Sequence, residues 1–333
     1  MIITKTPYRV SFFGGGSDYP QWYRNNGGEV ISTTINKYVY ISIRELNNFF
    51  FHKHRISYSQ IEEVTSYKQI RHNVVRNALL DKKELIKEMG LEIHYDGDLP
   101  ARSGMGSSST FLVGFLKALD GFFNSKKISK KNLAIESLNF EQNILKENVG
   151  SQDQIAATYG GFKNIIFKKN GHFEVKNFLN EKEKKIFCKN FFLIFTGFTR
   201  TAHEVSNSYI MKLNNEKKEN IAFSLELLNK AKAYLKKKDY ISIGNLLHKS
   251  WIEKKKLSNI VSNNTIDDLY ELGIKRGALG GKLLGAGGGG FLLFFVPQKK
   301  RKDFYEFFRK KNLILPLETS SSGSEIIYHE KKS

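Results

Sequence analysis

A stretch rich in glycine and serine lies between an expected strand and an expected helix, and its residue types suit phosphate binding. It reads Pro100-Ala101-Arg102-Ser103-Gly104-Met105-Gly106-Ser107-Ser108-Ser109. Glycines let the backbone approach a phosphate closely, and the first amides of a helix lack intrahelical acceptors. A flexible helix cap explains one serine and one glycine, but not all of them. We therefore predict a phosphate loop, although not a Walker motif, because no Gly-Lys-Ser/Thr follows.

Two carboxylates further along the chain could take part in chemistry on a bound phosphate, one by accepting a proton and the other by binding Mg²⁺. Ser151-Gln152-Asp153-Gln154 has the pattern of a capping box, which would place Asp153 in the first turn of a helix. The helix dipole favours an ionised carboxylate there, as suits a group that accepts or orients a hydroxyl proton. Glu141 lies beside Leu138 and Leu145 on an expected helix and could give a carboxylate to Mg²⁺. Taken singly, plain helix capping is the better explanation of Asp153, and a surface charge is the better explanation of Glu141.

A charged residue and an acid flank a glycine turn near the N-terminus. Arg9 lies inside an expected strand that runs into Gly14-Gly15-Gly16-Ser17-Asp18-Tyr19. Arg9 could stabilise a transferring phosphoryl group or pair with Asp153, and Asp18 could bind hydroxyl groups. The alternative is an ordinary β-turn with Asp18 as a turn residue.

A second glycine loop contains Gly-x-Gly-x-x-Gly at residues 285–290, the spacing of a dinucleotide-binding loop. That motif must open a helix and be followed ~20 residues later by an acid. Here the loop leads into the strand-like run 291–296. We therefore expect a tight loop packed against the phosphate loop or the substrate, and rank an oxidoreductase last.

The elements that must position these residues mix without a regular βα alternation, which favours an α+β fold. The expected strands cover 8–13, 30–35, 38–43, 91–95, 162–168, 172–175, 191–195, 283–296 around the glycine loop, and 325–329. The expected helices cover 66–80, 108–122, 132–146, 151–160, several segments across ~202–275, and 301–311. A charge-rich segment at 180–185 suggests two domains, 1–180 and 181–333.

Composition fits a globular protein of 333 residues with 40% hydrophobic residues and a single cysteine, Cys188. No apolar run approaches the ~20 residues of a membrane span, and the first residues lack a signal-peptide pattern, so we expect a cytoplasmic protein. The net charge of +20 could indicate an anionic partner. Because the lysines fall in scattered clusters, we interpret most of this charge as a composition bias with solvated helix faces.

Four segments, in this order along the chain, resemble motifs of the GHMP kinases, the family named for galactokinase, homoserine kinase, mevalonate kinase and phosphomevalonate kinase. They are residues 7–19, 100–109, 150–154 and 282–290. Any one of these motifs is a weak signal, but four of them in the family's order are highly specific for the family. Together they span nearly the whole chain. The resemblance implies ATP and Mg²⁺, an N-terminal domain like ribosomal protein S5, a ferredoxin-like C-terminal domain, and a site between them.

The resemblance also implies roles. Asp153 would be the catalytic aspartate with Arg9 beside the reacting hydroxyl, while Ser108 and Glu141 would hold Mg²⁺ and Asp18 a sugar hydroxyl. The implied ATP-binding residues are Pro100, Arg102, Ser103, Gly104, Met105, Gly106, Ser107, Ser108 and Ser109. The implied substrate-binding residues are Gly15, Gly16, Ser17, Asp18, Tyr19, Arg200, Gly287 and Gly288.

Departures from the family pattern bear on the acceptor. Galactokinases carry Glu-His where this chain has Gly15-Gly16, which predicts a roomier pocket and argues against galactose. The glycine turn and the segment 196–201 look more like the branch that phosphorylates heptose 7-phosphate at the anomeric hydroxyl, for nucleotide-activated heptose and surface polysaccharide. Arg102 or Arg200 could hold the distal phosphate. Met105 replaces the usual leucine.

Two alternatives stay open. One is a GHMP kinase for another sugar: a hexose, a uronic acid or a deoxysugar. The other is a basic nucleic-acid-binding protein, which predicts aromatic and basic residues interleaved on one surface, whereas the aromatics here fall mainly in apolar strand runs. We expect ATP and a sugar or sugar phosphate as partners, no nucleic acid or membrane, and a monomer or homodimer.

Overall fold

Two long antiparallel strands, β1 (Ile2–Phe13) and β2 (Gly28–Leu46), form the spine of the larger sheet. The computed structural model describes residues 1–87, 89–123, 128–200 and 202–330. Two strands were expected where β2 runs unbroken. The register shifts between Pro7 and Arg9 on β1, so β2 bends there without ending.

Within the described residues, eight strands make this sheet, in the order β12-β1-β2-β5-β3-β4, with β6 paired to β2 and β7 to β6. The remaining strands are β3 (His54–Ser57), β4 (Ile61–Val64), β5 (Gly90–Gly97), β6 (Phe162–Phe167), β7 (Phe173–Asn177) and β12 (Glu325–His329). The predicted hairpin and the predicted final strand are confirmed.

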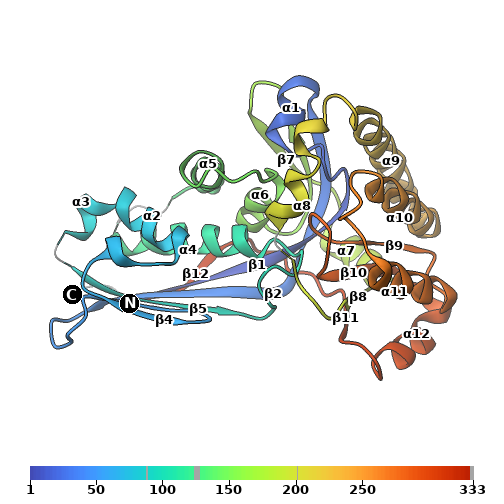
Figure 1. Ribbon diagram of the computed structural model, residues 1–333. Coiled ribbons are helices and arrows are strands. Elements are labelled where there is room, and N and C mark those ends of the chain that lie inside the picture. The colour runs from blue at the N-terminus through green and yellow to red at the C-terminus, as the bar shows by residue number, and fades with distance from the viewer. Residues whose placement is uncertain (88, 124–127, 201, 331–333) are drawn as a thin grey trace.

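Helices cover one face of this sheet (Figure 1). They are α2 (Asn73–Asp81), α3 (Lys83–Ile86), α4 (Ser107–Phe123), α5 (Lys130–Asn139) and α6 (Gln152–Tyr159). The predicted helix α4 is confirmed, and its apolar side is buried. Gly114 brings α4 close to β1, because a Cβ there would lie 2.7 Å from the Thr6 hydroxyl oxygen.

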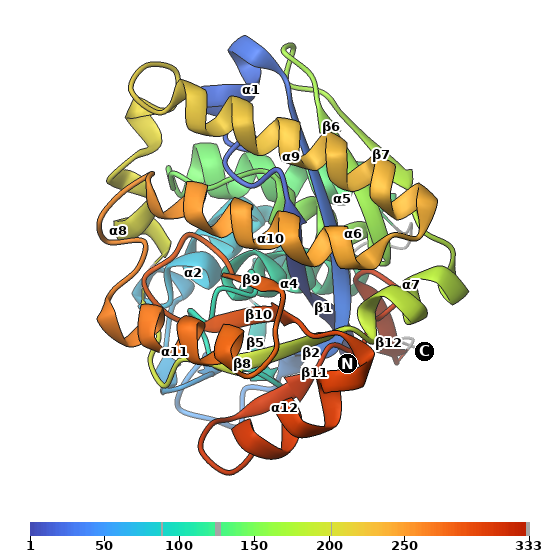
Figure 2. The same cartoon turned by 90° about the vertical axis from the view of Figure 1, so that its right-hand side faces the viewer.

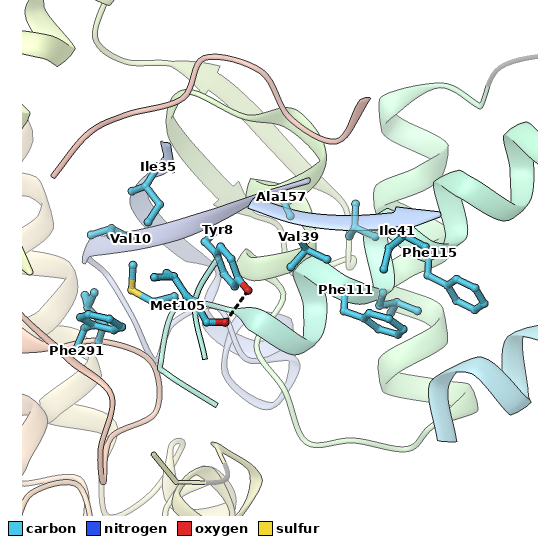
Figure 3. Close-up of a cluster of buried hydrophobic side chains, with 14 of the residues drawn as sticks. Tyr8, Val10, Ile35, Val39, Ile41, Met105, Phe111, Phe115, Ala157 and Phe291 are labelled. Atoms are coloured by element: carbon cyan, nitrogen blue, oxygen red, sulfur yellow. Dashed lines mark hydrogen bonds between the residues drawn. The ribbon is translucent and has the colours of Figure 1, made fainter. Parts of the chain in front are cut away.

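The core beneath α4 supports the phosphate loop (Figure 3). Met105 is fully buried in one cluster with Val10, Val39 and Phe291. Nearby, the Tyr8 hydroxyl donates to the Leu99 carbonyl oxygen at 3.2 Å, on the approach to the loop. The leucine-to-methionine departure is therefore a packing change under the loop.

The smaller sheet is antiparallel, in the order β11-β8-β10-β9. Its strands are β8 (Phe191–Phe195), β9 (Gly280–Leu283), β10 (Phe291–Phe295) and β11 (Ile314–Pro316). Every residue of β10 is buried, because both faces of the sheet are covered. Phe295 packs against Phe191 on one face, and Phe294 packs against Tyr270 and Phe304 on the other.

The remaining helices surround the smaller sheet and the spine (Figure 2). They are α1 (Pro20–Asn26), α7 (Glu181–Cys188), α8 (Ala202–Asn207), α9 (Lys218–Lys237), α10 (Tyr240–Lys255), α11 (Asn264–Lys275) and α12 (Arg301–Phe308). Single turns lie at Tyr67–Gln69, Ile210–Lys212 and Gln298–Lys300. The α+β expectation is confirmed. None of the helices in the described segments is both long and apolar enough to cross a bilayer.

Two predicted helices differ from the structure. The helix expected over 66–80 starts only at Asn73, because the Glu62 carboxylate accepts the backbone N–H groups of Arg71 and His72 and holds the chain out of a helix. The helix expected over 132–146 ends at Asn139 and widens into a π-helical turn, Phe140–Ile144. Such wide turns are frequent at functional sites.

The two parts of the chain share a core. The ring of Phe12 lies 5.2 Å from that of Phe191, and β12 pairs with β1 in the larger sheet. The division into two domains at residue 180 thus stays a prediction. Side chains and strands from before and after this position pack together.

The two glycine loops touch through their backbones. A Cβ on Gly104 would lie 2.7 Å from the Leu284 carbonyl oxygen, and a Cβ on Gly285 would lie 2.7 Å from the Gly104 Cα. The Phe291 N–H donates to the Ser103 carbonyl oxygen at 3.2 Å. The loop at 285–290 joins antiparallel strands and does not open a helix. The prediction of a tight loop packed on the phosphate loop is confirmed.

Substituting Gly285 with alanine should therefore destabilise the protein by more than the backbone strain that its left-handed φ of +68° alone would cause. Gly171 is the matched control, because its φ is +85° and nothing lies within 4 Å of a Cβ built there. We expect urea unfolding to show Gly285→Ala ~1–3 kcal/mol less stable than Gly171→Ala. Equal losses in the two variants would contradict the interlocked loops.

Candidate active site

A cleft of about 350 Å³ lies between the phosphate loop, the N-terminal glycine turn and the second glycine loop. Most of the predicted site residues line it. These are Arg9, Gly15, Gly16, Asp18, Tyr19, Arg102, Gly104, Gly106, Ser107, Ser108, Ser109, Glu141, Asp153, Arg200 and Gly287. The remaining predicted site residues do not line it, namely Pro100, Ser103, Met105, Ser17 and Gly288. Thr201, in the segment that suggested a heptose substrate, lies outside the described residues.

A bidentate ion pair lies at the centre of the cleft. Arg9 Nε donates to Asp153 Oδ1 at 2.7 Å, and Arg9 Nη2 donates to Asp153 Oδ2 at 2.6 Å. Arg9 Nη1 donates to the Gly104 carbonyl oxygen at 2.7 Å. Arg9 is 4% exposed, so strand β1 delivers a nearly buried guanidinium to both the acid and the phosphate loop. The predicted pairing of Arg9 with Asp153 is confirmed.

Gly106 makes this arrangement possible. A Cβ at Gly106 would lie 3.2 Å from Asp153 Oδ2 and 3.4 Å from Arg9 Cγ, and its φ is +76°. Immediately after it, α4 begins, with the Thr110 N–H donating to the Gly106 carbonyl oxygen at 2.8 Å. The amides of residues 107–109 therefore precede the first intrahelical donor and are available to an anion beside Asp153.

Glu141 is buried at 1% exposure, which rules out the surface-charge interpretation. The π-helical turn carries it to the cleft. The Ser109 hydroxyl donates to its two carboxylate oxygens at 3.0 and 2.9 Å, and Gln154 Nε2 also donates to Oε2. Burial raises the pKa of Glu141 to about 8. Such an enclosed carboxylate facing a cleft suits a cation as its partner.

The capping-box prediction is wrong. The Ser151 side chain does not cap α6 but accepts from Gln142 Nε2 at 2.9 Å and lies 3.2 Å from the Tyr23 hydroxyl. Gln154 turns inward to Glu141. Asp153 nevertheless lies in the first turn of α6, as expected. Spacing alone could not distinguish a cap from two contacts with residues distant in sequence.

Asp18 lies deeper in the cleft, next to the start of α6. Its Oδ1 accepts the Gly16 N–H at 3.0 Å, and its backbone oxygen accepts the Ser151 N–H at 2.8 Å. Burial, and then the nearby Asp153 carboxylate, raise the pKa of Asp18 to about 6. A buried carboxylate of this kind has free acceptor capacity for hydroxyl groups. A Cβ at Gly15 would meet nothing within 4 Å, which leaves room above Asp18.

Sequence reasoning gave no role to two lysines of the cleft wall, Lys254 on α10 and Lys282 in β9, although Lys282 begins the motif segment 282–290. Lys254 Nζ donates to the carbonyl oxygens of Leu283 and Gly285, and Lys282 Nζ donates to that of Phe12. Lys254 opens a run of three lysines, which is typical of a solvated helix end. Only the packing of α10 on β9 shows that it faces inward.

Mg²⁺ chemistry fits the residues present. No cluster of three or more His, Cys, Asp or Glu side chains gathers for a metal in the segments that the structure describes. The described residues therefore do not form a metal site made of protein side chains alone. Mg²⁺ usually takes one or two protein oxygens together with phosphate oxygens and water. Glu141 and the exposed Ser108 hydroxyl line the same cleft and match that pattern.

The site combines a helix N-terminus lined by glycines with an arginine–aspartate ion pair, on an α+β fold. These are the features of a small-molecule kinase. Residues 72–161 match the model of the GHMP kinases N terminal domain, and residues 231–313 match that of GHMP kinases C terminal. The chain belongs to the GHMP kinases and is a phosphotransferase with an alcohol group as acceptor.

Several relatives share most of the chain's length. It is 32% identical over 311 residues to D-glycero-alpha-D-manno-heptose 7-phosphate kinase of Campylobacter jejuni, which covers 86% of each chain. Among solved structures, a D-glycero-D-manno-heptose 1-phosphate kinase from Bacteroides thetaiotaomicron matches with a TM-score of 0.76 at 22% identity, covering 99% of this chain and 100% of that one. Methanococcus jannaschii mevalonate kinase matches with a TM-score of 0.72 at 24% identity, covering 96% and 98%. The two structural likenesses confirm the fold.

The pKa of Asp18 predicts a pH-dependent stability. Because its pKa is about 6 in the folded protein and 3.8 ordinarily, its contribution to stability is complete below pH 3.8 and is lost as the pH rises through 6. Asp18→Asn cannot ionise, so its stability relative to wild type should increase between about pH 4 and 6, by up to ~3 kcal/mol. Urea unfolding at several pH values measures this difference. Parallel curves for the two proteins would contradict the buried ionisation.

Proposed function

We propose that the protein transfers the terminal phosphoryl group of ATP to the anomeric hydroxyl of a sugar, D-glycero-D-manno-heptose 7-phosphate. The observation that carries the kinase chemistry is the Arg9–Asp153 pair, held against the phosphate loop by the Gly104 carbonyl oxygen. The heptose phosphate is supported by the 32% identical relative, whose name gives that substrate. The open space at Gly15 supports an acceptor other than galactose.

In this proposal the triphosphate of ATP lies over residues 104–109. The backbone amides at the start of α4 donate to its oxygens, and the helix dipole favours the negative charge. Glu141 and Ser108 would hold Mg²⁺, which supplies neutralisation of phosphate charge when bound. Ser109 and Gln154 keep the Glu141 carboxylate pointed at the cleft.

Asp153 accepts or orients the proton of the attacking hydroxyl. Arg9 fixes both carboxylate oxygens, which keeps Asp153 aligned, and places positive charge where the phosphoryl group passes. Asp18 accepts hydrogen bonds from sugar hydroxyls and so holds the acceptor in register. Phosphoryl transfer depends mainly on positioning and electrostatics, so these few groups suffice.

The proposed reaction belongs in the cytoplasm, where ATP is available. Its product, a sugar with an anomeric phosphate, is the form that a nucleotidyltransferase activates. This is consistent with a role in nucleotide-activated heptose and surface polysaccharide synthesis. We propose a monomer or a homodimer as the assembly.

Asp153→Asn should lower turnover by ~10²–10⁴-fold and leave ATP affinity nearly unchanged. The amide preserves the shape of the side chain but cannot accept the hydroxyl proton. Steady-state kinetics, together with calorimetric titration of a non-hydrolysable ATP analogue, measures both effects. Turnover within a few-fold of wild type would remove Asp153 from its role.

The acceptor is tested by ADP release across heptose 7-phosphate, free heptose, common hexoses, a uronic acid and a deoxysugar. We expect the highest kcat/KM for heptose 7-phosphate. The product should lose the reducing-sugar reaction, because the anomeric hydroxyl has been esterified. A retained reducing end would refute transfer to the anomeric position, and preference for another sugar would identify one of the alternative acceptors.

A further inference from the structure

Lys254 and Lys282 have no task in the mechanism above. Each ammonium group has three donors. Lys254 uses two on carbonyl oxygens, at 2.8 Å to Leu283 and 2.5 Å to Gly285. Lys282 uses one, at 3.2 Å to Phe12, and is only 6% exposed. In the described part of the chain, neither ammonium lies within ion-pair distance of a carboxylate. Donors therefore remain on both groups.

The two charges destabilise each other in the absence of an anion. Burial, and then repulsion from the nearby Arg9, lower the pKa of Lys282 to about 8, while attraction to Asp18 opposes the change. Burial also lowers the pKa of Lys254, followed by repulsion from Lys282 and Arg9. Cations gathered at a cleft wall without a counter-charge are costly unless a ligand supplies one. The geometry therefore favours an anion at this wall.

The position of the wall indicates which anion it takes. The ATP phosphates already have the start of α4, Arg9 and the Glu141 site. Lys282 lies near Arg9 and also near Asp18, the proposed ligand of the sugar hydroxyls, because both charges act on it. Two further polar atoms of the cleft lining, Ser11 Oγ and Gln152 Oε1, are buried without a hydrogen-bond partner. Such atoms suit sugar hydroxyls, so the cleft offers partners for both hydroxyls and an anion.

We propose that Lys254 and Lys282 form the subsite for the phosphate ester that the acceptor already carries. This inference rests on the proposed function and deepens it, because it explains why a phosphorylated sugar is preferred to a free one. It replaces the expectation that Arg102 or Arg200 holds this group. Arg200 Nε already lies 3.8 Å from Glu204, with its side chain 45% exposed, and Arg102 is exposed at the rim.

Lys254→Met tests the subsite, because methionine retains the apolar stem and removes the charge. We expect kcat/KM for heptose 7-phosphate to fall ~30-fold and that for free heptose to change less than ~3-fold. KM for ATP should stay within a factor of about two. Lys254→Arg should recover most of the loss, and Lys249→Met, on the exposed side of the same helix, should behave as wild type.

An equal loss with both acceptors would overturn the inference, because it would show that Lys254 acts on ATP or the transferring phosphoryl group. A second measurement separates this failure from failure of the proposed function. Calorimetric titration of heptose 7-phosphate without ATP requires no turnover. Binding to wild type that is lost in Lys254→Met and kept in Lys249→Met supports the subsite even if no sugar is phosphorylated. Binding that is equal in all three proteins, or absent from wild type, overturns it.

Discussion

The site depends on one ion pair, Arg9 with Asp153, which joins the first strand to the start of α6. The third contact of the guanidinium, to the Gly104 carbonyl oxygen, ties the phosphate loop to the same pair. Gly106 must lack a side chain for the carboxylate to reach this position. Arg9 on strand β1, Asp153 on helix α6 and the phosphate loop are therefore positioned together.

Charge is distributed around this pair according to what each part of the cleft must bind. Glu141 is enclosed by hydrogen bonds and lies on the side of α4, where a cation would meet phosphate oxygens. Asp18 lies on the acceptor side, where burial and Asp153 keep its proton affinity high. The two lysines provide positive charge beyond it. Opposite charges thus alternate across the cleft, with the Arg9–Asp153 salt bridge between the Glu141 and Asp18 carboxylates.

The elements with strong local signals were predictable from the sequence. The helix after the phosphate loop has a regular apolar face, and Asn170-Gly171 form a typical turn between the two strands of the hairpin, so both were placed nearly as they occur. The motif order also predicted which residues line the cleft. Contacts between distant segments were not predictable. The Ser151 hydroxyl bonds to Gln142 and Tyr23 rather than to its own helix, and Lys254 differs from its neighbours Lys255 and Lys256 only in the direction that tertiary packing gives it.

The backbone contact between Gly104 and Gly285 limits the ways in which ligands can enter and leave the cleft. The floor is assembled from both sheets, and Lys282 fastens it again to the end of β1 through the Phe12 carbonyl oxygen. Widening the cleft from below would separate all of these at once. We therefore expect sugar entry and ADP departure to occur away from this contact, on the part of the cleft that residues of α8 and α9 line.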